Sequence, residues 1–402
     1  MTLSQNPAQS PDPVVIVGMS RTPMGGFQGD FATLAAPELG AVAVKGALEN
    51  SGLLPDDIDQ AYMGCVLPAG QGQAPARQAI LRAGLPQDVG CTTINKMCGS
   101  GMQAAMMAHD AILAGSVDIM IAGGMESMTN APYLLPKMRG GARIGHDQVK
   151  DSMFLDGLED AYDRGKLMGV FAEQTAQHYQ FSREQQDDYA ITSLKRANAA
   201  IRKGCFKDEI TPVTVKSRKG EAVYDTDEQP GKARPDKIPT LRPAFAKDGT
   251  VTAANSSSIS DGAAALILMR QSDAQRRGLT PLARIIGHSS HAQEPEWFST
   301  APIGAIKKLY EKVGWADKDV DLYEINEAFA VVTMAAMRDL GLDHDKVNIH
   351  GGACAMGHPI GASGARILVT LISALRTHKK KRGIAALCIG GGEATAMAIE
   401  VM

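Results

Sequence analysis

The sequence predicts an α/β fold built from two similar halves. Short apolar runs rich in β-branched residues alternate with helical patterns along the 402 residues, which is typical of α/β proteins. Motifs of the first third recur near the C-terminus at a separation of roughly 265 residues. Residues 130–255 have no counterpart and form a predicted insertion between the two copies. The length allows two or three domains of about 150 residues each.

Composition excludes several classes of protein. A hydrophobic share of 44% and a charged share of 21% indicate a folded, soluble chain rather than a disordered one. The net charge of −3 gives no reason to expect a nucleic-acid or membrane partner. Six scattered cysteines without a CxxC pair indicate free thiols in a reducing cytoplasm and no metal site. Glycine is the outlier: the chain has 42, whereas average usage is about 7%.

The elements are predicted in chain order from these patterns. Residues 1–12 are polar and are expected to form a disordered tail. The predicted strands are Val14–Val17, Asp118–Ala122 and Ile384–Ile389, and the last two end in glycines. Helices are predicted for Pro37–Asn50 and Met102–Leu113, and others begin at Ala301 and near Ala362. The duplication rests on four anchors, which include Gly99-Ser100-Gly101 with Ala362-Ser363-Gly364, and Gly123–Glu126 with Gly390–Glu393.

The predicted insertion is basic inside an acidic chain. Residues 195–247 contain thirteen lysines and arginines and seven aspartates and glutamates. Such a run of charges is either a solvated surface or a binding surface for an anionic ligand.

Cys98 is a candidate nucleophile. It stands in Asn95-Lys96-Met97-Cys98-Gly99-Ser100-Gly101, directly before a predicted helix. The positive end of the helix dipole favours a thiolate, and the glycines allow close approach of a substrate. The alternative is a buried structural cysteine.

Three further segments carry candidate catalytic groups. His358 lies in a run with five glycines and precedes a proline, and it is either a general base or a structural histidine. Cys388 ends an apolar strand before Gly390-Gly391-Gly392, whose backbone N–H groups could stabilise an oxyanion; the alternative is a core cysteine. Asn326 follows an apolar run and could hold a water molecule, or cap a helix.

Together and in this order, these segments resemble the thiolase family. The matching motifs are NKMCGSG around Cys98, NEAFA at 326–330, GGACAMGHPIGASGAR at 351–366 and CIGGG at 388–392. RTPMGGFQG at 21–29, LRPAF at 241–245 and the run from Asn255 extend the similarity to nearly the whole chain from residue 13. The resemblance implies two βαβαβαββ halves in an αβαβα layered core with an inserted loop domain.

The resemblance also implies a two-step acyl transfer between coenzyme A thioesters. Cys98 would carry an acetyl group, and His358 would take the thiol proton. His358 and a water held by Asn326 would bind the thioester oxygen, and Cys388 would remove the α-proton of a second acetyl-CoA. The N–H groups of Cys98 and Gly390 would form a second oxyanion hole. This chemistry needs an acyl carrier, a base and oxyanion donors, but no metal and no permanently bound cofactor.

The remaining implications concern binding and assembly. Ser257 and Ala254 are expected at the pantetheine arm, as are Leu167 and Met168, which stand where short-chain members of the family have His-Met. Lys232 and Arg234 are candidates for the adenosine phosphates. The expected partners are acetyl-CoA, acetoacetyl-CoA and CoA, and a homotetramer, a dimer of dimers bridged by the insertion, is expected. The expected domains are 13–285, which includes the inserted loop domain at about 130–255, and 286–402.

Three alternatives stay open. A 3-ketoacyl-CoA thiolase acting on longer chains would share the reaction, and the walls that distinguish it lie in residues 130–175. A ketoacyl synthase would use Cys-His-His, which NEAFA and Cys388 argue against. A non-catalytic CoA- or lipid-binding protein would not need Cys98, His358 and Cys388 together. The tail GGGEATA departs from the family's commoner GGGMG, whereas MRGGARIG at 138–145 is similar to the acetoacetyl-CoA type.

Overall fold

One mixed sheet of ten strands runs through the computed structural model, which describes residues 12–218 and 220–402. The strand order is β12-β13-β14-β11-β1-β10-β5-β3-β4, with the short β2 paired to β10. The strands are β1 (Val14–Arg21), β2 (Gly25–Gly26), β3 (Gln60–Gly64), β4 (Gly90–Ile94), β5 (Ile119–Ser127), β10 (Ser260–Arg270), β11 (Ala283–Ala292), β12 (Leu322–Ile325), β13 (Arg382–Ile389) and β14 (Glu393–Val401).

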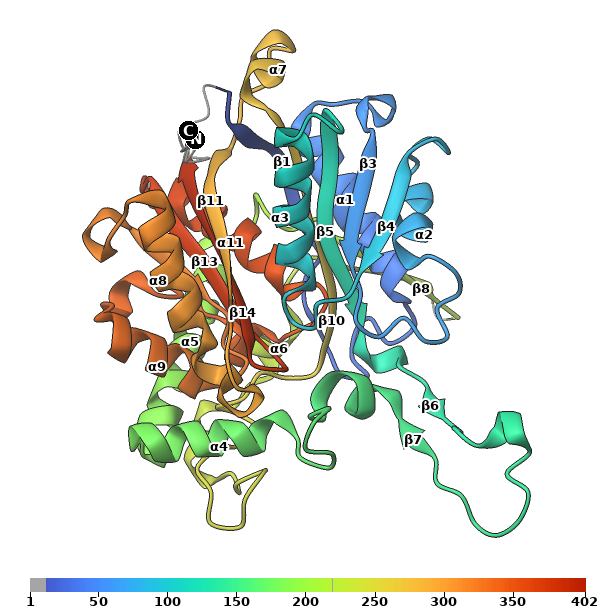
Figure 1. Cartoon of the computed structure of the whole chain (residues 1–402), viewed down its shortest axis with the longest axis vertical. Coiled ribbons are helices and arrows are strands. Elements are labelled where there is room, and N and C mark those ends of the chain that lie inside the picture. Colours follow the sequence, from blue (N-terminus) through green and yellow to red (C-terminus); the bar gives the residue numbers. More distant parts are fainter. Residues whose placement is uncertain (1–11, 219) are drawn as a thin grey trace, which may run out of the picture.

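The two halves of this sheet repeat the same pairing pattern. β10 lies antiparallel between β1 and β5, and β5 is parallel to β3. β14 lies antiparallel between β11 and β13 in the same way, and β13 is parallel to β12. The halves join where β1 pairs with β11 at only two positions, Val15 with Arg284 and Ile16 with Ala283. Figure 1 shows the N-terminal half in blue and cyan beside the C-terminal half in orange and red.

The two halves of the sheet form two layers of the molecule, and helices form three more. α3 (Ser100–Leu113) and α11 (Ser363–Thr377) share one core with residues of both halves of the sheet. α1 (Ala36–Ser51) and α2 (Pro75–Arg82) pack on the outer face of the N-terminal half. α8 (Ala301–Val313) and α9 (Ala330–Leu340) pack on the outer face of the C-terminal half. The predicted αβαβα layering is therefore confirmed.

The strands are apolar at successive positions because both faces of the sheet are buried. In β10, Ala264, Leu266 and Leu268 belong to the central core, whereas Ala263, Ala265, Ile267 and Met269 belong to the outer one. Successive residues of a strand point to opposite faces, so a sheet covered on both sides needs a continuous apolar run.

Glycines allow the two central helices to approach at their first turns. A methyl group on Gly101 would lie 2.7 Å from the backbone nitrogen of Ala365, and one on Gly364 would lie 2.3 Å from that of Met102. These are duplicated positions of the sequence. Their mutual contact brings the loop before α3 and the loop before α11 into one region.

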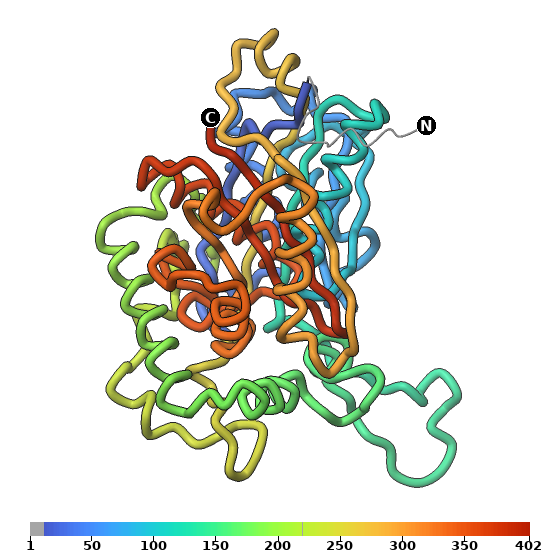
Figure 2. The backbone as a smooth tube through the Cα atoms, turned by 60° about the vertical axis from the view of Figure 1, so that its left-hand side comes forward, coloured from blue at the N-terminus to red at the C-terminus, as the bar shows by residue number. Residues whose placement is uncertain are grey.

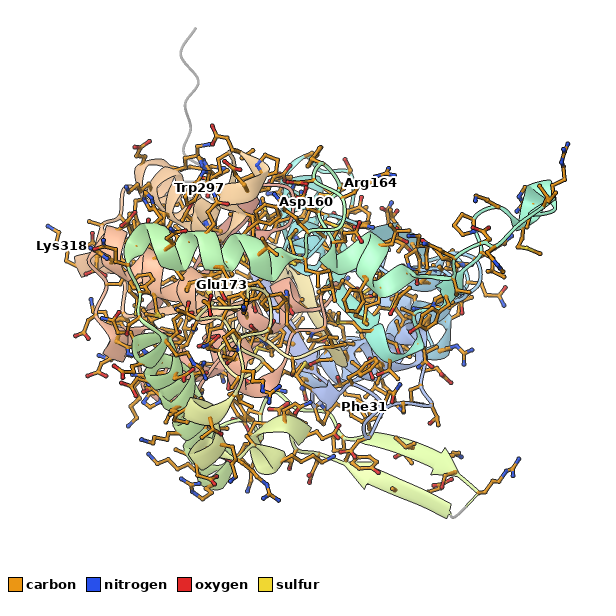
Figure 3. All side chains as sticks on the ribbon, turned by 90° about the horizontal axis from the view of Figure 1, so that it is seen from below. Phe31, Asp160, Arg164, Glu173, Trp297 and Lys318 are labelled. Atoms are coloured by element: carbon orange, nitrogen blue, oxygen red, sulfur yellow. The ribbon has the colours of Figure 1, made fainter. Side chains whose placement is uncertain are left out.

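The insertion contains more regular structure than the predicted loop domain. It includes α4 (Met168–Tyr179), α5 (Arg183–Lys203), α6 (Glu228–Lys232), the hairpin β8 (Val213–Ser217) and β9 (Gly220–Tyr224), and the pair β6 (Tyr133–Leu134) and β7 (Lys150–Asp151). Residues 133–151, which we call the arm, project away from the rest of the molecule in both views (Figures 1 and 2). Figure 3 shows the β8–β9 hairpin extending from another side.

A buried ionic group fastens the insertion to the sheet. The guanidinium of Arg21, at the end of β1, donates to Glu209 at 2.5 Å and to the two carboxylate oxygens of Asp227 at 2.7 and 2.9 Å. All three side chains are fully buried. Because breaking such a group leaves an uncompensated buried charge, the insertion is held firmly against β1.

The predicted elements agree with the structure apart from their ends. The strand predicted at Val14–Val17 extends to Arg21, and the one at Asp118–Ala122 runs as β5 to Ser127. The boundary proposed after residue 285 falls within β11. The predicted tail lies outside the described residues except for Asp12, which accepts hydrogen bonds from Ser272. No helix of the described chain is long and apolar enough to cross a membrane.

Candidate active site

Cys98 lies in a tight turn between β4 and α3. Met97, the residue before it, has φ of 48°, in the left-handed region that a non-glycine side chain rarely adopts. The Ser100 hydroxyl stabilises this turn, because it accepts from the Lys96 N–H at 2.9 Å and donates to the Met97 carbonyl at 2.6 Å. A methyl group on Gly99 would lie 2.4 Å from the side chain of Ile389, so the turn packs tightly against the end of β13.

The sulfur of Cys98 faces backbone donors. The N–H groups of Gly390 and of Cys98 itself hydrogen-bond to it and lower its pKa, but burial has the larger effect and raises the pKa to about 11. The helix dipole was expected to favour a thiolate, whereas burial acts in the opposite direction and favours the neutral thiol. The surrounding loops leave the thiol only partly exposed, and this partial loss of hydration exceeds the stabilisation from the N–H groups.

His358 is held with one ring nitrogen available. Its Nδ1 contacts the Ser363 hydroxyl, which itself donates to the Pro359 carbonyl at 2.9 Å. The hydroxyl therefore accepts from Nδ1–H, and this assigns the tautomer in which Nε2 carries the lone pair. Nε2 is buried and has no hydrogen-bond partner among the residues that the structure describes. Burial, with a smaller contribution from Arg366, lowers the pKa of His358 to about 3, so the ring is neutral.

Cys388 lies deeper than Cys98. It is 1% exposed, near the end of β13, and burial and the nearby Cys98 raise the pKa of its thiol far above the usual value. The turn that follows has Gly391 at φ of 94° and Gly392 at φ of 87°, both in the region that favours glycine. This turn leads into β14 and leaves the Gly390 N–H directed at the Cys98 sulfur.

Asn326 follows β12, and its side-chain amide is buried. Its backbone N–H donates to Ala386 on β13 at 2.9 Å, which fixes its position. Its side-chain Oδ1 and Nδ2 are both buried, and within residues 12–218 and 220–402 neither has a hydrogen-bond partner. Since buried polar groups are normally hydrogen-bonded, this amide is available for a water molecule or a substrate oxygen.

Two buried glutamates position these loops, and the sequence reasoning did not single them out. Glu327 accepts from Tyr189 at 2.9 Å, Ser193 at 2.8 Å, Asn348 at 2.8 Å and the Cys354 N–H at 3.0 Å. It thereby ties the segment that contains Asn326 to α5 and to the loop before His358. The only available signal was its place beside Asn326 in the NEAFA motif.

Glu126, the second of these glutamates, ends the GGME run of β5. Its carboxylate accepts from the N–H groups of Val66 at 2.9 Å, Leu67 at 3.1 Å and Gly361 at 2.8 Å. It thus joins a loop of the N-terminal half to the loop that carries His358. Burial raises the pKa of Glu126 to about 7, although these hydrogen bonds oppose the shift. The duplicated GGxE pattern was its signal in the sequence.

A cavity of about 920 Å³ opens above Cys98, His358 and Gly390. Its walls are largely apolar, and the side chains that form them include Phe154, Leu158, Phe245, Phe298 and Phe329. Three of the residues predicted at the pantetheine arm, Leu167, Met168 and Ser257, also line it. α4, which begins at Met168, crosses this end of the molecule in Figures 1 and 3.

Three other predicted binding residues do not line this cavity. Lys232 binds the carboxylate of Glu228, one helical turn earlier in α6, and borders a separate hollow of about 330 Å³. Arg234 is exposed just beyond α6. Ala254 packs against a different apolar cluster, which includes Leu194. Lys232 lies outside the cavity wall because it pairs with Glu228, and Ala254 lies outside it because it packs against apolar side chains.

Comparison with known proteins gives a consistent result. Residues 14–272 match the family model "Thiolase, N-terminal domain" and residues 279–401 match "Thiolase, C-terminal domain". The chain is 48% identical to an acetyl-CoA acetyltransferase of Allochromatium vinosum over 391 residues, and the aligned region covers 97% of this chain and 99% of that protein. A thiolase of Ascaris suum in complex with coenzyme A superposes with a TM-score of 0.92 at 42% identity, over 97% and 100% of the two chains. The acetyl-CoA acetyltransferase of Bacillus anthracis gives 0.95 at 40% identity, over 97% and 99%.

Proposed function

The chain belongs to the thiolase family, and we propose that it catalyses the reversible condensation of two acetyl-CoA molecules to acetoacetyl-CoA and CoA. The observation that carries this proposal is the meeting of a thiol, a neutral histidine and backbone N–H donors at one cavity. These are the groups that acyl transfer through a covalent thioester requires.

The first half-reaction transfers an acetyl group to Cys98. His358 Nε2 takes the thiol proton as the sulfur attacks the thioester carbon, and the unpartnered Asn326 amide supports a role, through a water molecule, in stabilising the oxyanion. The carbon–sulfur bond to CoA then breaks, and the leaving CoA thiolate takes the proton from His358. An acetyl-Cys98 thioester remains.

The second half-reaction forms the carbon–carbon bond. The Cys388 thiol first gives its proton to His358 Nε2 and then, as a thiolate, removes a proton from the methyl carbon of a second acetyl-CoA. This carbon attacks the acetyl-Cys98 carbonyl. The N–H groups of Cys98 and Gly390 are the donors for the oxyanion that forms, which their contact with the sulfur supports. Collapse of this intermediate breaks the carbon–sulfur bond to Cys98 and releases acetoacetyl-CoA, and the Cys98 thiolate takes the proton from His358.

We propose that coenzyme A thioesters are substrates and that no cofactor is bound permanently. Leu167, Met168 and Ser257 lie on the cavity wall, which supports contact with the pantetheine arm. Lys232 and Arg234 stay predictions for the adenosine phosphates, since both are exposed but outside the cavity wall. Ala254 stays a prediction without support from the cavity geometry.

Assembly and location complete the proposal. We expect a homotetramer in the cytoplasm that serves fatty-acid metabolism. The six cysteines are unpaired, which supports a reducing compartment. The arm carries exposed apolar side chains, which supports a role in subunit contact: Tyr133, Leu135, Met138, Ile144 and Val149.

Thiolysis kinetics test the substrate assignment. We expect kcat/KM to fall steeply when the 3-ketoacyl-CoA chain is lengthened beyond four or five carbons, measured up to sixteen carbons. A flat or rising profile would instead favour a 3-ketoacyl-CoA thiolase of β-oxidation. Absence of both thiolysis and acetyl-CoA exchange would leave only a CoA-binding role.

A further inference from the structure

Two histidines and an aspartate from opposite halves of the chain meet at the C-terminal part of α3. His109 and Asp110 are neighbours in α3, and His288 lies in β11, 178 residues after Asp110. Within residues 12–218 and 220–402, this is the only group of at least three His, Cys, Asp or Glu residues whose ligand atoms all lie within 4.8 Å of one another. None of the proposed catalytic steps uses it.

The three side chains converge on one point. His109 Nδ1 and His288 Nε2 each lie 2.9 Å from the same oxygen of Asp110, Oδ1. The two imidazole rings are edge to face, with centroids 5.1 Å apart and planes at 89°. Ligand atoms about 2.0–2.1 Å from a tetrahedral ion are separated by about 3.3 Å. Small side-chain movements would therefore suffice to place an ion between them.

Burial and charge suit a cation at this position. The side chains of His109 and His288 are 3% and 10% exposed, so packing holds both rings, whereas that of Asp110 is 61% exposed. The open side gives an ion a path from solvent and leaves room for water ligands.

We propose that His109, Asp110 and His288 form a binding site for a divalent transition-metal ion such as Zn²⁺, Co²⁺ or Ni²⁺. Two imidazole nitrogens and one carboxylate oxygen suit these ions, whereas Mg²⁺ and Ca²⁺ prefer oxygen ligands alone. The bound ion links α3, the helix that follows Cys98, to β11 of the other half. The Lys312 ammonium, which donates to the His288 carbonyl at 2.9 Å, adds a positive charge nearby and weakens the affinity.

Metal binding to the full chain, treated first with a chelator, tests the site. We expect the chain to bind one Co²⁺ whose visible absorption is that of nitrogen and oxygen ligands, without the thiolate charge-transfer band that binding at Cys98 or Cys388 would give. Zn²⁺ should displace it and raise the melting temperature, whereas Mg²⁺ should do neither. Asp110→Asn keeps the shape of an exposed side chain, and we expect it to weaken binding at least about tenfold.

Two further variants make the result decisive. Asp118→Asn changes another exposed aspartate outside the cluster and should bind Co²⁺ like the parent. His288→Gln should lose the Co²⁺ spectrum and the Zn²⁺-dependent rise in melting temperature. The proposal is overturned if Asp110→Asn and His288→Gln bind as the parent does, or if the parent gives only a thiolate spectrum or binds no ion.

Discussion

Cys98 and His358 rest as a neutral pair, and one cause explains both states. Burial raises the pKa of the thiol to about 11 and lowers that of the imidazole to about 3, because both charged forms lose hydration at the base of the cavity. A thiolate–imidazolium pair is therefore disfavoured before substrate enters. In the proposed mechanism the proton moves as the sulfur attacks, because the thioester carbon then accepts the electron pair of the sulfur.

Alkylation of the free enzyme reports this resting state. Because the Cys98 pKa lies above the neutral range, the thiolate fraction should grow about tenfold for each pH unit between pH 7 and 9. We expect the rate of inactivation by iodoacetamide to rise with the same slope, with label on Cys98 by peptide mapping. A rate that is already constant below pH 7 would instead show an ion pair at rest.

Replacement of the proposed nucleophile separates acyl transfer from binding. We expect Cys98→Ala to retain no labelled acetyl group after incubation with acetyl-CoA and denaturation, since no other residue is proposed to carry it. Cys91→Ala changes a partly buried cysteine outside the cavity and should acetylate normally. Label retained on Cys98→Ala would refute the assignment.

Replacement of Cys388 should block only the second half-reaction. We expect Cys388→Ala to form the acetyl-enzyme but to lose exchange of the acetyl-CoA methyl protons with deuterium, because the proposed base is missing. Mass spectrometry of the protein and proton NMR of the substrate measure the two steps separately. Normal exchange in this variant would remove Cys388 from the mechanism.

Among the elements, the crossing of α3 and α11 determines whether the site exists. Cys98 lies just before one helix and His358 five residues before the other, so the distance between the helix starts controls the distance between these two proposed catalytic residues. Gly101 and Gly364 meet backbone atoms of the opposite helix, which cannot move aside as a flexible side chain can. The helices can approach this closely only without side chains at these positions.

Adding one methyl group at the crossing should therefore be costly. We expect Gly101→Ala and Gly364→Ala each to lower the free energy of unfolding by about 1–3 kcal/mol, the usual cost of overpacking. Urea unfolding followed by circular dichroism measures this change. Gly231→Ala is the control, since a methyl group there would meet no atom within 4 Å. Equal stability of all three variants would contradict a close-packed crossing.

Sequence patterns predicted elements better than they predicted contacts between them. The buried strands and the helices that follow glycines were accessible because each is specified by residues close together in the chain. Glu126 was missed because its partner Gly361 is 235 residues away, and the pairing of Lys232 with Glu228 was not foreseen although Glu228 lies only one turn from it. The Cys98 pKa depends on burial by several loops, which a local motif does not contain.

At the scale of the whole molecule, the arm projects from the fold and exposes apolar side chains. Ile144, at 90% exposure, stands with other apolar side chains on a segment that projects from the layers (Figure 2). Exposed apolar surface of this kind marks association sites. The proposed tetramer would bury it.

Charge on the arm should consequently change the assembly and leave the fold intact. We expect Met138→Asp combined with Ile144→Asp to give a smaller oligomer by size-exclusion chromatography with light scattering, with an unchanged circular dichroism spectrum. Val223→Asp, on the exposed β8–β9 hairpin, is the matched control and should keep the parent's mass. An unchanged mass of the double variant would show that the arm does not join subunits.

The two halves of the chain repeat the sheet and the helices, but only the first half has a cysteine at the position of Cys98. The relation that matches Gly101 with Gly364 places Gly361 opposite Cys98. The carbonyl of Gly361 fills the space beside Gly124, where a methyl group would lie only 2.0 Å from its oxygen, and the Gly361 N–H donates to Glu126. The position equivalent to the proposed nucleophile is thus buried in the interior, where it joins the two halves. Under the proposed mechanism each chain would hold one acyl group, although its architecture is double, and the second copy would serve as a scaffold for the first.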